Sequence, residues 1–498
     1  MWADSRLPFR LPGHGSLHLG SGLKVIDREP AEPGAAAVIG PDTPATLDRP
    51  GLDPARALSA LRADPERRLA VRDVWTALWS SRLLVLAAGV ATVLLFGFGP
   101  VRGAFNPPGV TRGFGSVGDV LAAPFARWDS SWYLVIAHFG YRPDLGHITA
   151  SRAAFFPLYP LGIRALGWIG SPPIVAGVAI STAAFAVGLY GIHRLTTLEL
   201  GPPASASGRS GGAPAAARMA VLATAFAPMG LFFSAVYSES LYLALSVGVF
   251  WAARRGRWAA AGLLGGLAAA TRSAGLVLLL PALMIYLYGP RADAASGVTR
   301  SGLARLVPRH RLRADVLWLA VIPAGALVFS LGLALAGGDG LAPLRAQGVW
   351  GRHFAGPYVA VWHGLRAAFE GARQLLSFQR AHVYFPEATG SPTVAAGHNL
   401  IQFAFLLAAI PALVLALRRL PVAYGVYVLA ALALPLSEPV KGQPLMSLPR
   451  FLVVLFPLSI ATGAWLAEHP RARGPLLALS GMLMVAFLAQ FSTWHWVA

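Results

Sequence analysis

The chain has 498 residues, of which 55% are hydrophobic and 13% are charged, and its mean hydropathy is +0.57. Soluble globular proteins carry about 25% charged residues, so the composition excludes an ordinary soluble domain and predicts an all-α polytopic membrane protein. The net charge of +19 does not indicate a nucleic-acid partner, because the basic residues are spread over short loops between apolar segments. Cysteine is absent, which excludes disulfides, thiolate metal sites and cysteine nucleophiles.

Residues 1–80 are rich in Pro, Gly, Ala and Arg and have no sustained apolar period. They contain no short apolar stretch after a basic start, so we expect no cleavable signal peptide. We interpret them as a disordered cytoplasmic tail in front of a transmembrane domain of residues 81–498. Within the tail, residues 53–72 have apolar residues at helical spacing, and Pro65 is expected to interrupt this short helix.

The first predicted crossing is Arg82–Pro100, which is long enough to span a bilayer. Trp75, Trp79 and Arg82 are expected to anchor its start at the membrane interface. Because the arginine-bearing tail is expected inside, this helix runs outward, and residues 101–171 form a first outer loop. At the end of that loop, residues 155–170 contain two prolines and a central arginine, a pattern that indicates an interfacial helix on the outer leaflet.

Apolar segments then alternate with arginine-bearing loops along the rest of the chain. Two of the segments carry a polar insert, YSES at 237–240 and TRS at 271–273, and are each expected to be two helices meeting at an outer turn. The result is about eleven crossings, a multi-pass location in the cell membrane and a cytoplasmic N-terminus. A long outer loop, 338–397, is expected to hold an amphipathic helix around Val361–Leu376. The later segments are Pro172–His193, Met219–Trp251, Trp258–Gly289, Val316–Gly337, Asn399–Leu417, Val422–Leu436, Phe451–Leu466 and Pro475–Phe491.

Few carboxylates fall on the predicted outer side, and Asp129 is the strongest candidate for a catalytic base. It lies between Trp128 and Trp132 soon after the first crossing, where partial desolvation and the neighbouring Arg127 could tune its pKa. An alternative is that Asp129 caps the following helix, which would end at Gly140. The two roles are compatible, because a cap fixes the position of a carboxylate.

Other polar and aromatic residues are candidates for substrate binding. Glu239 is costly near membrane depth unless it is paired, and it either serves the function or caps the next helix. Arg272 suits a phosphate oxygen, or alternatively forms an interior ion pair with Glu239. Lys441 and Arg450 lie in a proline-framed outer loop and could hold a lipid phosphate, or be ordinary loop charges. The remaining candidates are Trp128, Arg127, Tyr133, His138, Tyr141 and Tyr237, of which His138 and Tyr141 could equally be interfacial residues.

Several motifs are absent from the sequence. There is no P-loop, HExxH or dinucleotide fingerprint, and the histidines are too dispersed to indicate a metal site, so no cofactor and no metal are predicted. There is also no DxD pair of the kind that coordinates the metal of a nucleotide sugar. For an outward-facing transferase this indicates a donor whose leaving group is a polyprenyl phosphate.

Four stretches together resemble the PIG-V-like mannosyltransferases (GPI mannosyltransferase 2-like) of the GT-C glycosyltransferase superfamily. They span roughly Ala126 to Leu280, and their order and spacing match as well as their content. Beyond them, the resemblance rests on hydropathy and on SLPRF at 447–451. The stretches are RWDSSWYLVIAHFGY, AFFPLYPL, FAPMGLFFSAVYSESLYLAL and GLAAATRSAGL.

The resemblance implies a GT-C-like helical bundle that transfers mannose from a polyprenyl-phosphate sugar to an acceptor on the outer face, with inversion and without a metal. In this superfamily an acid in the first outer loop is the expected base, and here that acid is Asp129. The acceptor in eukaryotic family members is a glycosylphosphatidylinositol precursor. The Ala-, Arg- and Gly-rich composition is typical of a high-GC bacterium, where a lipoglycan, a cell-wall glycan or a protein hydroxyl would replace it.

The expected partners are therefore the lipid-linked donor, a lipid or glycan acceptor and membrane lipids. The main alternative is a transporter or flippase of a lipid-linked sugar, which would also have outer polar loops and intramembrane charges. Internal repeats with interrupted helices would favour it, and the sequence shows none. A membrane scaffold without catalysis is a third reading.

Overall fold

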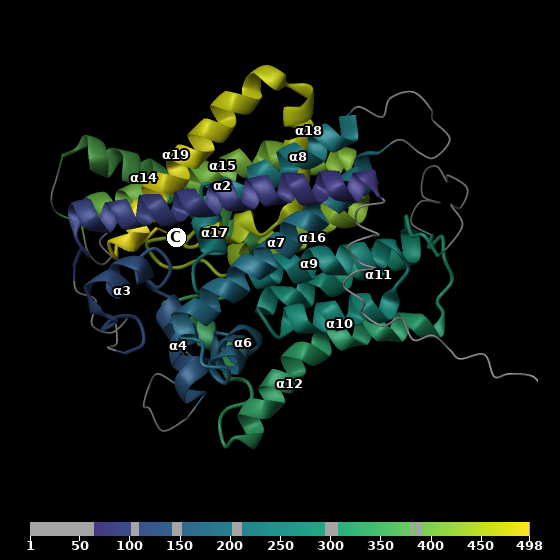
Figure 1. Ribbon diagram of the computed structural model, residues 1–498, viewed down its shortest axis with the longest axis horizontal. Helices are drawn as coiled ribbons and strands as arrows, with labels where there is room; N and C mark the ends of the chain where they lie inside the picture. Colours follow the sequence, from purple (N-terminus) through teal and green to yellow (C-terminus); the bar gives the residue numbers. More distant parts are fainter. Residues whose placement is uncertain are drawn as a thin grey trace, which may run out of the picture. The chain divides into compact units, whose positions relative to one another are not determined.

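The chain folds into apolar helices that run back and forth between the two ends of a bundle (Figure 1). Leu58–Ala498 form one compact unit, and the described residues all lie in it. These described ranges contain helices and isolated bridges of Val440 but no β-strand, which confirms the prediction of an all-α polytopic membrane protein. The computed structural model describes residues 64–100, 109–141, 152–201, 212–293, 307–378, 381, 383–384 and 391–497.

The first described helix, α2 (Pro65–Phe96), begins inside the segment predicted to be tail. Pro65 is the first residue of α2, and Asp64 before it has an extended backbone, so a helix break is present at Pro65 as predicted, whereas a helix before it stays a prediction. Proline is tolerated there, since the amide of this position would have no partner in the helix. The carboxylate of Asp64 caps the helix by accepting the backbone N–H groups of Glu66 and Arg67 at 2.9 and 3.2 Å. The rest of the predicted tail and residues 53–63 lie outside the described residues.

Arg82 lies inside the bundle, so its predicted place at the membrane interface is wrong. Its side chain is buried, and Nη1 donates to the Gly230 carbonyl and to Ser234 Oγ, both at 2.8 Å. Nη2 donates to the Ala225 carbonyl at 3.0 Å. These acceptors lie where one helix ends and the next has not begun, and carbonyls at such a break need donors. Arg82 therefore stabilises the break.

Both segments with a polar insert are divided, as predicted. The first consists of α8 (Gly212–Ala225), the 3₁₀ turn η2 (Gly230–Phe233) and α9 (Glu239–Arg254). The second consists of α10 (Trp258–Ala269), η3 (Ser273–Leu278) and α11 (Leu279–Tyr288). Glu239 and Arg272 thus lie beside helix breaks, at the same end of the bundle.

Every predicted crossing overlaps a helix. Among the described residues, five helices are long and apolar enough to cross a membrane: α2, α7, η5 with α12, α15 and α19. The others are shorter, and the total of about eleven crossings stays a prediction. The remaining long elements are α7 (Pro173–Leu200), η5 (Ala314–Ala320), α12 (Val321–Leu335), α15 (Pro392–Arg419), α16 (Val422–Ser437), α18 (Phe456–Glu468) and α19 (Pro470–Ser492).

Several short helices lie near the end of the bundle at which α2 ends. Figure 1 shows α3 (Gly115–Ala122) and α4 (Ser130–Phe139) beside this end. The predicted interfacial helix is α6 (Leu158–Gly167), and the predicted amphipathic helix is α14 (Pro357–Leu376). Preceding α14 are α13 (Ala342–Arg345) and η6 (Ala346–Trp350), and α17 (Leu448–Val453) links α16 to α18.

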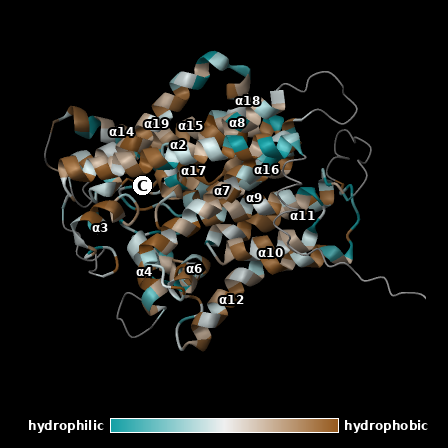
Figure 2. Ribbon diagram, viewed as in Figure 1, coloured by the Kyte–Doolittle hydropathy of each residue, from teal (hydrophilic) through white to brown (hydrophobic). Residues whose placement is uncertain are grey.

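Hydrophobic residues predominate along the long helices (Figure 2), and many of their large side chains are exposed. On α12, Leu327 and Val328 are 65% and 68% exposed, and only 22% of an apolar 18-residue stretch within η5 and α12 is buried. Such a surface is unfavourable in water, so a hydrocarbon environment is expected to cover it.

Candidate active site

Asp129 is placed by a sharp turn between α3 and α4. Trp128 has a φ of 54°, in the left-handed region that non-glycine residues seldom adopt, and Asp129 follows as the residue before α4. Asp129 occupies the N-cap position, and its carbonyl accepts the N–H of Trp132 at 3.1 Å. Within the described residues its carboxylate makes no capping hydrogen bond, so the side chain is available for another partner.

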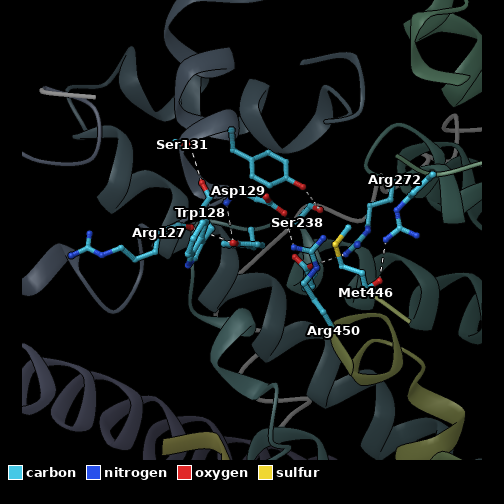
Figure 3. A network of polar contacts seen from close by, with 12 residues as sticks. Arg127, Trp128, Asp129, Ser131, Ser238, Arg272, Met446 and Arg450 are labelled. Carbon is cyan, nitrogen blue, oxygen red and sulfur yellow. Dashed lines mark hydrogen bonds and ion pairs between the residues drawn. The ribbon is translucent and has the colours of Figure 1, made fainter. Parts of the chain in front are cut away.

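The carboxylate of Asp129 contacts Arg450 of α17. Arg450 Nη1 donates to Asp129 Oδ2 at 2.6 Å, and Arg450 Nε lies 3.3 Å from Glu239 Oε1. Arg272 Nη1 donates to the same Glu239 oxygen at 2.7 Å. The four side chains form one alternating chain of charges, Asp129–Arg450–Glu239–Arg272, which we call the charge cluster (Figure 3).

The members of the charge cluster differ in exposure. The side chain of Glu239 is 1% exposed, whereas those of Asp129, Arg450 and Arg272 are 15%, 13% and 15% exposed. Glu239 Oε2 is buried and has no hydrogen-bond partner among the described residues. A small polar ligand can therefore reach Asp129 and the two arginines more readily than Glu239.

Electrostatics keep Arg450 charged. Burial alone would lower the pKa of the Arg450 guanidinium, but the carboxylates of Asp129 and Glu239 more than offset this and raise the pKa above its ordinary value.

The structure contains the ion pair between Arg272 and Glu239, which was one of the two interpretations of Arg272 from the sequence. Glu239 is the first residue of α9 and makes no capping bond there within the described residues.

Two tyrosines support the turn around Asp129. Tyr237 Oη accepts the backbone N–H of Asp129 at 3.1 Å and donates to the Arg127 carbonyl at 3.2 Å. Tyr133 Oη is 2.8 Å from Ser238 Oγ, next to Glu239. Both tyrosines are buried, so they tie the Asp129 turn to the α9 break and do not present a free surface to substrate.

Arg127 and Trp128 lie on the other side of this turn. Arg127 points away from Asp129 (Figure 3), and its Nε donates to the Ser492 carbonyl at 3.2 Å. Its guanidinium also lies 4.8 Å from the ring centroid of Trp494. The cation in contact with Asp129 is thus Arg450, and the expectation that Arg127 lies beside this carboxylate is wrong. Trp128 Nε1 donates to the His495 carbonyl at 3.2 Å.

The other candidates are not part of the charge cluster. His138 is exposed at the end of α4, where it lines a cavity of about 180 Å³ with Arg164. Tyr141 donates to the Phe155 carbonyl and packs against Phe329. Lys441 is exposed in the loop between α16 and α17. Substrate roles for these three stay predictions.

Arg352 is a neighbour of the charge cluster that sequence reasoning missed. It lies between η6 and α14 and donates to the carbonyls of Glu438 and Met446. A lone arginine in a loop gives no motif, and its acceptors are backbone atoms, so no pattern of residue types could have identified it.

The segment that carries Asp129, Glu239 and Arg272 is similar to a known protein family. Residues 103–287 match the family described as Mannosyltransferase (PIG-V). The chain is PIG-V-like. This confirms the resemblance predicted from the motifs between Ala126 and Leu280, whereas Arg352 and Arg450 lie outside the matched PIG-V segment.

Curated relatives agree with the PIG-V match. The chain is 32% identical over 187 residues to GPI alpha-1,6-mannosyltransferase 2 of Rattus norvegicus, covering 35% of this chain and 34% of the relative. It is 32% identical over 169 residues to the protein of the same name from Mus musculus, covering 32% and 31%. The chain thus matches about a third of the length of these relatives. No solved structure matches the chain.

Proposed function

We propose that this protein is a membrane mannosyltransferase that moves mannose from a polyprenyl-phosphate donor to an acceptor hydroxyl on the outer face, with inversion at the anomeric carbon. The observation that carries the proposal is the contact between Asp129 and Arg450 at 2.6 Å. It brings a partly exposed carboxylate of the PIG-V-like segment into contact with a permanent cation from α17, which lies outside that segment. A proton acceptor beside a phosphate-binding cation is what such a transfer requires.

The proposed reaction is a single displacement. The acceptor oxygen forms a bond to C1 of the sugar while the bond between C1 and the donor phosphate oxygen breaks. Asp129 takes the proton of the acceptor hydroxyl, and the polyprenyl phosphate leaves with the bonding electron pair. Arg450 and Arg272 stabilise the charge of that phosphate, because a guanidinium presents several donors suited to phosphate oxygens.

The difference in exposure favours Asp129 over Glu239 as the base. Glu239 is 1% exposed and holds both arginines, whereas Asp129 is 15% exposed and contacts only Arg450 among them. A base must reach the proton that it removes, so Asp129 is the catalytic residue and Glu239 is a positioning residue. Glu239 keeps the two guanidinium groups close enough to bind one phosphate.

The distribution of arginines between the two ends of the bundle supports one orientation in the membrane. In this proposal the N-terminus is cytoplasmic and α2 runs outward, so the charge cluster lies on the outer face. The opposite end of the bundle carries Arg254 and Arg419, which pair with Glu199 and Glu468. An arginine-rich inner end supports this orientation.

The test is transfer by the purified full-length chain in lipid nanodiscs. Radiolabelled polyprenyl-phosphate mannose is supplied with a panel of glycolipid acceptors, and the anomeric configuration of the product is determined. We expect labelled product of inverted configuration. In parallel proteoliposomes, movement of the lipid-linked sugar between leaflets without any transfer would establish the flippase instead and overturn the proposal.

A further inference from the structure

Arg450 lies on α17, which is too short to fix its own orientation in the bundle. α17 has six residues, and its first turn starts from Ser447, whose φ of 69° lies in the left-handed region. The backbone N–H of Arg450 donates to the Ser447 carbonyl at 3.1 Å. Strained residues of this kind persist only where surrounding contacts hold them. The loop Glu438–Ser447 must therefore be fixed from outside.

Arg352 supplies that restraint at both ends of the loop. Its Nη1 donates to the Glu438 carbonyl at 3.1 Å, and its Nη2 donates to the Met446 carbonyl at 3.0 Å. Met446 directly precedes the left-handed Ser447. Hydrogen bonds from a charged donor are stronger than neutral ones, and a planar guanidinium fixes the distance between its two acceptors.

Backbone and side-chain contacts other than the Arg352 guanidinium also hold this loop and the end of α16 before it. The backbone N–H of Ala355 donates to the carbonyl of Ser437, the last residue of α16, at 2.8 Å, and Asn399 Nδ2 donates to the Gly442 carbonyl at 3.0 Å. The backbone of Arg352 also forms an antiparallel bridge with Val440. The Arg352 guanidinium differs from these contacts because it joins two carbonyls, those of Glu438 and Met446. Burial lowers the pKa of Arg352 to about 10, with Glu438 opposing the change and Arg450 adding to it, so Arg352 remains protonated at neutral pH.

We propose that Arg352 is a positioning residue for the transfer: by holding the Glu438 and Met446 carbonyls, it sets α17 so that Arg450 reaches Asp129 and Glu239. This inference rests on the proposed function. It assigns a role to the long outer loop, which lies outside the matched PIG-V segment, and makes the active site depend on three separate parts of the chain.

The kinetic test compares Arg352→Ala and Arg352→Lys with a control variant from the predicted outer loop 338–397, in which Arg352 also lies. Arg345→Ala is matched, because Arg345 is 70% exposed and pairs with Asp339 away from the charge cluster. We expect Arg352→Ala to lower kcat/KM at least tenfold, Arg352→Lys to recover little of it, and Arg345→Ala to stay within twofold of wild type. An Arg352→Ala enzyme as active as Arg345→Ala overturns the proposal.

A double variant separates positioning from general damage to the fold. If Arg352 acts through Arg450, adding Arg352→Ala to Arg450→Lys should lower kcat/KM by less than twofold further. If the loss of kcat/KM in the double variant instead equals the product of the two single-variant losses, Arg352 acts independently of Arg450 and the positioning role is rejected.

Hydrogen exchange gives a readout that needs no activity. In the purified full-length chain, Arg352→Ala should speed exchange of the amides of residues 438–450, while Arg345→Ala leaves them unchanged. If wild type transfers no sugar but this exchange effect is present, the proposed function fails and the restraint stands. If wild type is active and Arg352→Ala changes neither exchange nor rate, the restraint fails and the function stands.

Discussion

Arg450 and Asp129 are 321 positions apart in the chain and meet at 2.6 Å. Asp129 lies in the PIG-V-like segment and Arg450 lies in α17, so the site forms only when these distant parts of the chain have packed together. Arg450 is the cation on which the proposed mechanism depends most, because it contacts both carboxylates of the charge cluster.

The shape of the Arg450 guanidinium should matter as well as its charge. Arg450→Lys keeps a positive charge but loses the planar fork that joins Asp129 and Glu239. We expect kcat/KM to fall about 10- to 100-fold, which corresponds to roughly 1.4–2.7 kcal/mol of transition-state stabilisation. Steady-state kinetics measure this.

A matched control for this change exists at the other end of the bundle. Arg419 forms a two-bond pair with Glu468 at 2.6 and 2.8 Å, outside the charge cluster. Arg419→Lys should keep wild-type activity. Equal activity of the two lysine variants would contradict the role of Arg450.

Arg272 should affect the donor more than the acceptor. Arg272→Gln removes the charge that is proposed to hold the donor phosphate, so we expect the KM for the donor to rise about tenfold or more while the KM for the acceptor changes little. Varying each substrate in turn measures the two constants. An unchanged donor KM would count against this assignment.

Glu239 should be important for stability as well as activity. Glu239→Gln leaves Arg272 and Arg450 without their shared carboxylate, and breaking a buried ion pair costs up to about 3–5 kcal/mol, reduced here by the partial exposure of both arginines. We expect a lower midpoint of thermal unfolding in detergent. Glu370→Gln removes an exposed pair with Arg366 on α14 and should cost about 0.5 kcal/mol or less. Similar losses for the two variants would contradict this prediction.

The sequence predicts the helices and their breaks well because both leave local signals. The YSES and TRS inserts interrupt long apolar segments, and the structure divides the helices at those places. Burial is harder to predict. Arg82 follows two tryptophans like an interfacial residue, yet it is buried because carbonyls of the α8–η2 break, distant in sequence, need its donors.

Contacts between side chains are least predictable from neighbouring residues. Arg127 is two residues from Asp129, but the left-handed turn at Trp128 separates the two side chains. The partner of Asp129 comes from α17, and Arg352 binds only backbone carbonyls. Neither relationship leaves a sequence pattern, since both depend on how distant helices pack.

The central claim is that Asp129 is the base of a sugar transfer. Asp129→Asn keeps the shape of the side chain and removes its ability to accept the proton, so mannose transfer by the purified protein should fall about 100-fold or more while the protein remains folded. The control is Asp119→Asn, because the Asp119 carboxylate accepts the backbone N–H groups of Gly113 and Phe114 and takes no part in the charge cluster. Loss of transfer in Asp129→Asn alone is the predicted result, and a folded Asp129→Asn protein that transfers mannose at the wild-type rate would contradict it.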